Sequence, residues 1–447
     1  MRATPGDLVV YRLRHGLLTA PQHPGRHRRN KVYLISSLVY REGSEMTATQ
    51  SAALVEAAGT HNEVLAPSAP QPAPMVSIVD LHKQYRTADG DVHAVRGISF
   101  DIARGEFVTL LGPSGCGKTT ILRSVAGLET PTSGEIAIGG RPVYSSNRRI
   151  RLTPAQRQIG MVFQSYAIWP HMSVFDNVAY PLRRRKLRKA EIIARTTEVL
   201  EMLGLDHAAQ RPATKLSGGQ QQRVAVARAL VSRSELILFD EPLSNLDAKL
   251  RKEVRQEIRD LQQRLGITVL YVTHDQEEAM AVSDRILVLE SGEIKDQGAP
   301  TRVYSRPADV FAANFVGESE TLPGTVVDAD DDHWLVQTGI GQLHVARHPH
   351  DTVRVSESVV LTVRPEHLQL REAASDTPVP AIAGSVRSAS FLGPFAELVV
   401  ELESGHLVTA RVTGGAGAAL GSRVHVRIEP HHVVLHPDRS PAGHDTQ

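Results

Sequence analysis

A glycine-rich segment with one lysine and two threonines is the clearest place in the sequence for chemistry. It consists of Gly112, Pro113, Ser114, Gly115, Cys116, Gly117, Lys118, Thr119 and Thr120. The apolar run 107–111 before it has the length of a buried strand, and a helix-forming segment follows it. Glycines let backbone N–H groups turn inward around phosphate oxygens, and a helix N-terminus attracts the same anions. The pattern GxxxxGK[ST] therefore predicts a phosphate site, with Lys118 on the β- and γ-phosphates and the Thr119 hydroxyl on Mg²⁺.

Two adjacent carboxylates, Asp240 and Glu241, follow the apolar run 236–239. A buried strand of this kind delivers its last residues to the carboxyl edge of a parallel sheet, where ligands of α/β proteins bind. We expect Asp240 to hold Mg²⁺, directly or through water, and Glu241 to polarise an attacking water as general base. The alternative is that the two carboxylates only cap the helix that follows them.

A second helix start rich in hydrogen-bond donors precedes the helix-forming run 221–230. It is formed by Ser217, Gly218, Gly219 and Gln220. A serine cap followed by two glycines exposes backbone N–H groups and could grip another phosphate. Taken alone, the same four residues also fit an ordinary serine-capped helix.

Three single residues lie at strand positions that suit the same site. Gln164 follows the strand 159–163, and its amide could bind Mg²⁺ or hold the attacking water. His274 ends another apolar strand, from which an imidazole could bond the γ-phosphate. Tyr85 could stack on an adenine, or it could be an ordinary strand residue facing solvent.

Short apolar strands alternate with amphipathic helices over residues 75–318, and these elements must position the residues above. The alternation predicts an α/β domain with a mostly parallel core sheet. Helices are expected at 189–203 and 249–264, where apolar residues recur on one face. Residues 319–437 are rich in Val, Thr, Gly and His in short alternating runs, which predicts an all-β domain.

The all-β region also repeats itself. Residues 361–370 resemble residues 426–435, with Pro365 and Pro430 at an offset of 65. Gly324 and Gly384 share an offset of 60. Two copies of one small β unit account for these matches, although chance similarity between valine-rich strands is the alternative.

The composition of the chain argues against some classes of function. The chain has 447 residues and a formal net charge of +1, which gives no reason to expect nucleic-acid binding. One cysteine, Cys116, cannot form an internal disulfide, and its place at a helix N-terminus favours the reactive thiolate. No uncharged apolar stretch reaches the length of a membrane helix.

Three further segments stand apart. Residues 1–74 are basic and then Ala/Pro-rich, which predicts a disordered extension or a misassigned start, and residues 438–447 are expected to be a flexible tail. The basic run 183–189 is interpreted most simply as a solvated helix start. The alternative for this run is a contact with the anionic inner leaflet of a membrane.

Taken in order, these residues resemble an ATP-binding cassette (ABC) ATPase, a P-loop fold with a helical subdomain. Residues 112–119 resemble its Walker A loop, Gln164 its Q-loop, and 216–220 its LSGGQ signature. Residues 236–241 resemble Walker B, 244–247 the D-loop, His274 the switch histidine, and Tyr85 the A-loop aromatic. The all-β region, with Val363-Arg364-Pro365-Glu366, resembles the OB-like TOBE-type domain of importer ATPases.

The resemblance implies partners as well as chemistry. Such a chain binds ATP and Mg²⁺, forms a homodimer with ATP at the interface, and docks on two membrane-spanning permease subunits at the cytoplasmic face of the inner membrane. An external substrate-binding protein delivers the substrate, for which ferric iron or a polyamine is favoured over sugar or phosphonate. A soluble cassette ATPase that is not coupled to transport is the alternative.

Overall fold

The computed structural model describes residues 73–88, 90–349, 351–372, 381–413 and 419–438, and two short strands nearer the N-terminus. Those strands, β1 (Leu13–Arg14) and β2 (Leu17–Leu18), pair antiparallel within a unit that ends at Pro72. The expected extension 1–74 and tail 438–447 fall almost entirely outside the described residues.

A six-stranded sheet forms the centre of the α/β domain. Its order is β13 (Glu293–Gly298), β12 (Arg285–Glu290), β5 (Phe107–Leu111), β11 (Thr268–Thr273), β10 (Leu236–Asp240) and β9 (Gly160–Val162). All neighbours pair parallel except β12 and β13, which are antiparallel. Every residue of β5, β10 and β11 is buried, as near-continuous apolar strands covered on both faces require. The expected mostly parallel core sheet is therefore confirmed.

The α/β domain also contains a second, antiparallel sheet, which was not predicted. It contains β4 (Gly90–Ile102), β3 (Val76–Thr87), β6 (Ser133–Ile138), β7 (Arg141–Ser145) and β8 (Ile150–Arg151). Its inner residues, such as Val76 and Ile78, share one core with Ile121 of helix α2 (Lys118–Ala126) and Leu110 of β5. Helix α2, which starts at the glycine-rich loop, is thereby enclosed between the two sheets.

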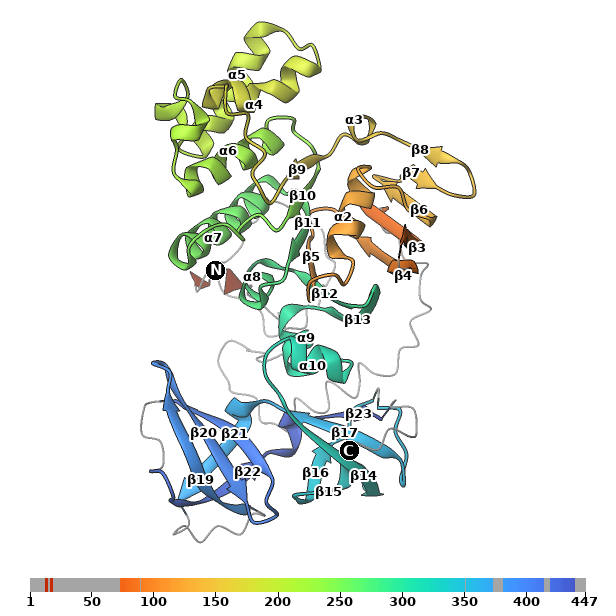
Figure 1. Ribbon diagram of the computed structural model, residues 1–447, viewed down its shortest axis with the longest axis vertical. Helices are drawn as coiled ribbons and strands as arrows, with labels where there is room; N and C mark the ends of the chain where they lie inside the picture. Colours follow the sequence, from red (N-terminus) through yellow and green to blue (C-terminus); the bar gives the residue numbers. More distant parts are fainter. Residues whose placement is uncertain are drawn as a thin grey trace, which may run out of the picture. The chain divides into compact units, whose positions relative to one another are not determined.

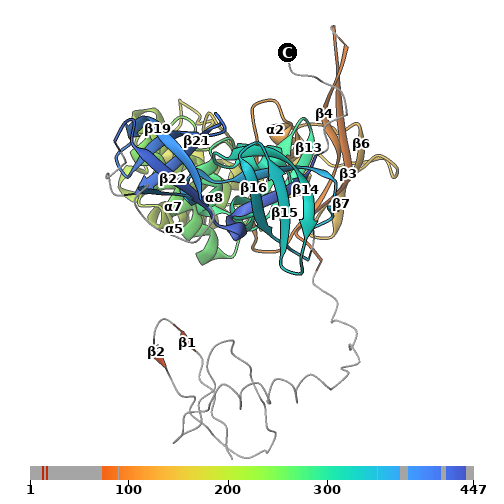
Figure 2. The same cartoon turned by 90° about the horizontal axis from the view of Figure 1, so that it is seen from below.

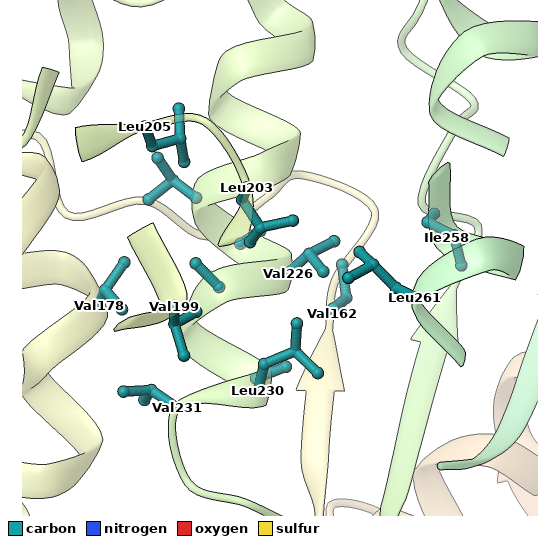
Figure 3. Packing of buried hydrophobic residues seen from close by; sticks show 14 of the residues in the cluster. Val162, Val178, Val199, Leu203, Leu205, Val226, Leu230, Val231, Ile258 and Leu261 are labelled. Atoms are coloured by element: carbon teal, nitrogen blue, oxygen red, sulfur yellow. The ribbon is translucent and has the colours of Figure 1, made fainter. Parts of the chain in front are cut away.

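A helical layer covers the other face of the central sheet. It contains α4 (Val174–Arg184), α5 (Lys189–Met202), α6 (Gly218–Leu230) and α7 (Ala248–Leu265). Figure 3 shows Val226 of α6 beside Val162 of β9, with Val199 of α5 and Val178 of α4 farther from the strand; all four belong to one apolar core. The helices expected at 189–203 and 249–264 are confirmed as α5 and α7.

The exposed basic run 183–189 covers the end of one helix and the start of the next, so the expected solvated helix start is only part of it. Arg183 and Arg184 complete the last turn of α4, the next residues form the turn, and Lys189 opens α5. Positive side chains at a helix C-terminus complement its dipole, which explains their placement there. Among the described residues, no helix is both long and apolar enough to cross a membrane.

Smaller helices complete the α/β domain. They are α3 (Pro154–Arg157), α8 (Gln276–Val282), α9 (Pro300–Ser305) and α10 (Val310–Phe315). Helices α9 and α10 close a separate apolar cluster against Ile286 and Val288 of β12. They lead into the all-β domain.

The all-β domain consists of two five-stranded antiparallel sheets that share one core (Figures 1 and 2). The first is ordered β16 (Gly341–Ala346), β15 (His333–Thr338), β14 (Glu320–Ala329), β17 (Ser358–Val363) and β23 (Val433–Pro437). The second is ordered β21 (Leu407–Thr413), β20 (Phe395–Leu402), β19 (Ile382–Phe391), β22 (Arg423–Ile428) and β18 (Leu368–Glu372). The two orders match strand for strand, which confirms the repeat.

The last strand of each repeat is exchanged. After β17 the chain crosses into the second sheet as β18, and after β22 it crosses into the first as β23. The exchanged pairs are equivalent: Leu361 lies opposite Leu435, and Val426 lies opposite Leu370. At the crossovers the rings of His367 and His432, one from each repeat, stack with centroids 3.7 Å apart.

Both repeats need glycine at one strand position. A Cβ on Gly324 would lie 2.7 Å from Val336 Cγ1 and 2.8 Å from the Gln337 carbonyl oxygen. A Cβ on Gly384 would lie 2.8 Å from Val400 Cγ1 and from the Glu401 carbonyl oxygen. The adjacent strands approach too closely for any side chain at these two positions.

We predict that Gly324→Ala destabilises the all-β domain by about 1–3 kcal/mol, the usual cost of overpacking. Gly339→Ala is the matched control, because a Cβ at Gly339 meets nothing within 4 Å. Denaturant unfolding followed by the emission of buried Trp334, in a Trp169→Phe background, measures both. Equal stabilities for the two variants would contradict the predicted close approach.

Candidate phosphate and hydrolysis site

The glycine-rich loop has a backbone that only glycine accommodates. Gly115 and Gly117 have φ values of 82° and 102°, in the left-handed region. A Cβ on Gly117 would lie 2.3 Å from the Ala94 carbonyl oxygen, and one on Gly112 would lie 2.4 Å from that of Leu289. The loop is thus fixed tightly against two neighbouring segments, and it forms the bare-backbone cradle that a phosphate requires.

Lys118 lies inside this loop. Its side chain is buried, and Nζ donates to the carbonyl oxygens of Gly112 at 2.7 Å and Pro113 at 2.8 Å. Lys118 is also the first residue of α2, so the ammonium adds to the positive end of the helix dipole. An anion at this helix start would meet the ammonium and the free N–H groups together.

The expected reactivity of Cys116 is wrong. The thiol is 3% exposed, and burial raises the pKa of Cys116 above its usual value although Lys118 acts in the opposite direction. The Sγ atom also lies 2.7 Å from where a Cβ on Gly112 would be. Cys116 therefore fills space inside the loop, and the helix N-terminus does not make it a reactive thiolate.

Asp240 ends strand β10 beside the start of α2. It is 3% exposed, and its Oδ2 lies 3.3 Å from Nη2 of Arg123. Burial raises the pKa of Asp240, while Arg123 and a hydrogen bond from the Thr119 side chain lower it. A carboxylate and a hydroxyl held together at one edge are hard oxygen donors, the kind that Mg²⁺ prefers. The described residues fit a magnesium ion here.

Glu241 and His274 meet at the next position along this edge. Oε2 of Glu241 lies 3.1 Å from Nδ1 of His274, and both side chains are partly exposed. Glu241 has a φ of 45°, a strained conformation for a residue other than glycine, and its N–H donates to the Val272 carbonyl. The strained turn points the Glu241 carboxylate at His274, away from the buried strand.

Sequence reasoning missed a buried network beneath His274. Glu278 of α8 is 3% exposed and accepts hydrogen bonds from Tyr271 at 3.0 Å and Thr273 at 2.8 Å. Burial raises the pKa of Glu278. Arg251 of α7 binds Asp275 and the Leu246 carbonyl, so it joins the segment after Glu241 to the segment after His274. Only the position of Glu278, four residues after His274, could have indicated this network.

Gln164 lies two residues beyond the end of β9, with an exposed side chain. Its carbonyl oxygen accepts a hydrogen bond of 2.9 Å from Nδ2 of Asn245, in the segment that follows Glu241. The structure thereby links the Gln164 segment to the Asp240–Glu241 edge through the main chain.

The segment Ser217–Gln220 forms a capping box at the start of α6. The Gln220 N–H donates to Ser217 Oγ at 3.4 Å, and the Ser217 N–H donates to Gln220 Oε1 at 3.2 Å. Figure 1 shows α6 in the helical layer, apart from α2. Among the described residues, no hydrogen bond joins 217–220 to the loop 112–120. The structure does not bring these two predicted phosphate-binding elements together within one chain.

Tyr85 lies on β3, opposite Val92 of β4. Its ring is half-buried, with Nζ of Lys83 4.6 Å from the ring centroid. Within the described ranges it forms no hydrogen bond with the loop 112–120. Its contact with an adenine stays a prediction.

The fold and the site together define the class of protein to which this chain belongs. A phosphate loop that leads from a parallel strand into a helix, beside a buried strand-end aspartate, is the construction of a P-loop ATPase.

Comparison with known proteins identifies the family within this class. Residues 95–244 match the family described as "ABC transporter", and residues 361–435 match that described as "TOBE domain". The "Fe(3+) ions import ATP-binding protein FbpC" of Agrobacterium fabrum is 49% identical over 329 residues, which are 73% of this chain and 89% of that protein. The "Spermidine/putrescine import ATP-binding protein PotA" of Thermobifida fusca is 43% identical over 330 residues, 74% of this chain and 84% of that protein. The chain belongs to the ABC transporter family, as an ATP-binding subunit and an ATPase.

We predict that Cys116 reacts slowly with iodoacetamide at pH 7–8, because burial limits access of the reagent and the raised pKa lowers the thiolate fraction. The rate should keep rising with pH beyond the range in which an ordinary thiol has finished titrating. Since Cys116 is the only cysteine, mass spectrometry of the whole chain counts the label directly. The denatured chain is the control, and equal native and denatured rates at pH 7.5 would contradict the prediction.

Proposed function

We propose that this chain is the ATP-hydrolysing subunit of an ABC importer. It would couple ATP binding and hydrolysis to uptake through two separate membrane-spanning permease subunits, supplied by an external substrate-binding protein. In such a complex the chain is peripheral, at the cytoplasmic face of the membrane. The observation that carries the proposal is the contact between Glu241 and His274 beside the buried Asp240, because it groups the proposed base, its proposed partner and a proposed metal ligand at one strand edge.

Nucleotide binding is assigned to the loop and the edge of the sheet. Lys118 would exchange the carbonyls of Gly112 and Pro113 for phosphate oxygens, while the loop N–H groups surround them. Thr119 and Asp240 would hold Mg²⁺, and the exposed amide of Gln164 would complete its shell. The metal, when bound, neutralises the developing phosphate charge.

Hydrolysis is assigned to Glu241 as general base. Its carboxylate would accept a proton from the attacking water, and His274, 3.1 Å away, would hold that carboxylate in place and bond the γ-phosphate. The strain at Glu241 supports this role, since such conformations persist where the surrounding structure imposes them for function.

The segment Ser217–Gln220 is assigned to the nucleotide of a second chain. Within one chain it is apart from the phosphate loop (Figure 1), and its capped helix start would bind an anion supplied from outside that chain. A two-fold symmetric dimer would place this segment of each chain against the loop of its partner, with ATP between them.

Ferric iron or a polyamine is the substrate class that we propose, on the strength of the two relatives named above. Uptake of labelled Fe³⁺ and of labelled spermidine, compared in cells with and without this chain, separates the two. A soluble ATPase not coupled to transport is the second candidate. It would change neither uptake and would not co-purify with membrane proteins.

We predict that Glu241→Gln retains ATP binding and loses about 10²–10⁴-fold in hydrolysis, the usual effect of removing a general base. Lys118→Ala should instead weaken nucleotide binding itself, because it removes the ammonium from the loop. Equilibrium binding and steady-state ATPase assays on the full chain distinguish the two outcomes. Normal turnover by Glu241→Gln would exclude it as the base.

We predict that two inactive variants, Lys118→Ala and Ser217→Arg, regain ATPase activity when mixed. In a mixed dimer both lesions fall in one site, and the other site keeps an intact Lys118 and an intact Ser217 from opposite chains. Mixing Lys118→Ala with Glu241→Gln is the matched control, because each site then retains one lesion and no activity returns. If the first mixture stays inactive and Glu241→Gln remains monomeric with Mg-ATP, the site is not shared.

A further inference from the structure

Arg228 is a buried cation with no carboxylate partner among the described residues. It lies in the last turn of α6, the helix that Ser217 caps, and it is 8% exposed. Burial lowers the pKa of Arg228 to about 10, so it remains charged at neutral pH. A buried charge must be compensated by hydrogen bonds or an opposite charge. The groups that bind the guanidinium therefore indicate the role of Arg228.

The partners of Arg228 are in the turn that follows Gln164. Nη1 donates to the carbonyl oxygen of Ala167 at 2.5 Å, and Nη2 donates to that of Tyr166 at 2.6 Å. The guanidinium also lies over the ring of Trp169, 4.8 Å from its centroid. All three contacts reach one short segment, which starts two residues after Gln164.

That segment is strained. Tyr166 and Ala167 have φ values of 60° and 48°, so two consecutive residues with side chains occupy the left-handed region. Such a backbone persists only where its surroundings impose it, and the two hydrogen bonds from Arg228 end on these two residues.

Both elements that Arg228 joins also carry a buried polar group without a partner in the described part of the chain. The Tyr166 hydroxyl is one, and the side-chain amide of Gln222 in α6, fully buried, is the other. Unsatisfied polar groups are rare in folded proteins, and they mark positions that rearrange or store strain.

We propose that Arg228 is a positioning residue for Gln164. By holding the Tyr166–Ala167 turn, it fixes the main chain from which the Gln164 amide projects, and it makes this turn move together with the helix that begins at Ser217. Asn245 holds the Gln164 carbonyl from the other side, so the segment is held between α6 and the residues after Glu241. The inference rests on the proposed role of Gln164 at the Mg²⁺ site.

The test variant is Arg228→Lys, which keeps the charge and loses the two-pronged donor. Arg228→Met is the second variant, since an apolar side chain of similar length often replaces a buried cation without unfolding the protein. Arg364→Lys is the matched control. Arg364 is 4% exposed, donates to three main-chain carbonyls and lies over the Tyr304 ring, but it joins the two domains instead.

Two readouts are measured on the full chain. The first is the Mg²⁺ concentration for half-maximal ATPase activity at saturating ATP. Both Arg228 variants should raise it about tenfold, as loss of an outer-shell partner of a metal ligand does, with little change in the KM for ATP. Added to Gln164→Ala, either variant should cause no further loss, because the two act through one group.

The second readout does not depend on turnover. In a Trp334→Phe, Glu241→Gln background Trp169 is the one remaining tryptophan, and its emission reports the turn directly as Mg-ATP binds. We expect the emission change in the chain with native Arg228 and its loss in both Arg228 variants, with saturable ATP binding retained. Arg364→Lys should keep the change.

The outcomes separate the two proposals. If Gln164→Ala lowers activity but both Arg228 variants behave like Arg364→Lys in both readouts, Arg228 is only structural and the inference is overturned. If Gln164→Ala has no effect on the Mg²⁺ dependence, the proposed role of Gln164 fails and the inference fails with it.

Discussion

The parallel register of three buried strands is the constraint on which the site depends. Asp240 at the end of β10 lies opposite Val272 of β11, and Thr273, the next residue, lies opposite Leu111 at the end of β5. Each strand therefore ends within one residue of its neighbour. The phosphate loop, the Glu241 turn and the His274 turn all leave the sheet at the same edge, so residues more than a hundred positions apart become neighbours.

Strain and buried charge accompany this edge. Glu241, Tyr166 and Ala167 adopt left-handed backbone conformations that the loops alone would not keep. Three buried arginines bind main-chain carbonyls instead of carboxylates: Arg157 at the end of α2, Arg228 at the strained turn, and Arg364 at the junction of the two domains. An arginine can do this because its planar fork donates to two or three carbonyls at once and remains charged. Arg157 and Arg364 bind carbonyls in the last turns of helices, whereas Arg228 binds the carbonyls of a turn that no helix or strand ladder holds.

Local sequence patterns were sufficient to predict the strands that lead to the phosphate loop and to Asp240, and the repeat in the all-β domain. The strand before Gly112, the strand before Asp240 and the repeat at 361–370 and 426–435 are all visible as apolar runs with a distinctive residue at a fixed place. The antiparallel sheet of β3, β4, β6, β7 and β8 was not predicted, because short half-exposed strands such as β8 carry little periodicity. The burial of Cys116 and the partners of Arg228 depend on contacts between distant segments, which no spacing encodes.

The exchange of β18 and β23 makes the all-β domain an intramolecular dimer that the chain itself keeps from dissociating. Each half lacks an edge strand that only the other can supply, so a half-domain on its own would expose an unpaired strand edge together with half of an apolar core. Neither half can be a folding intermediate of ordinary stability, and the first sheet has to wait for β23, the last described strand, before it is complete. The domain therefore closes as one cooperative unit, late in synthesis, after the ATPase domain before it in the chain has already emerged.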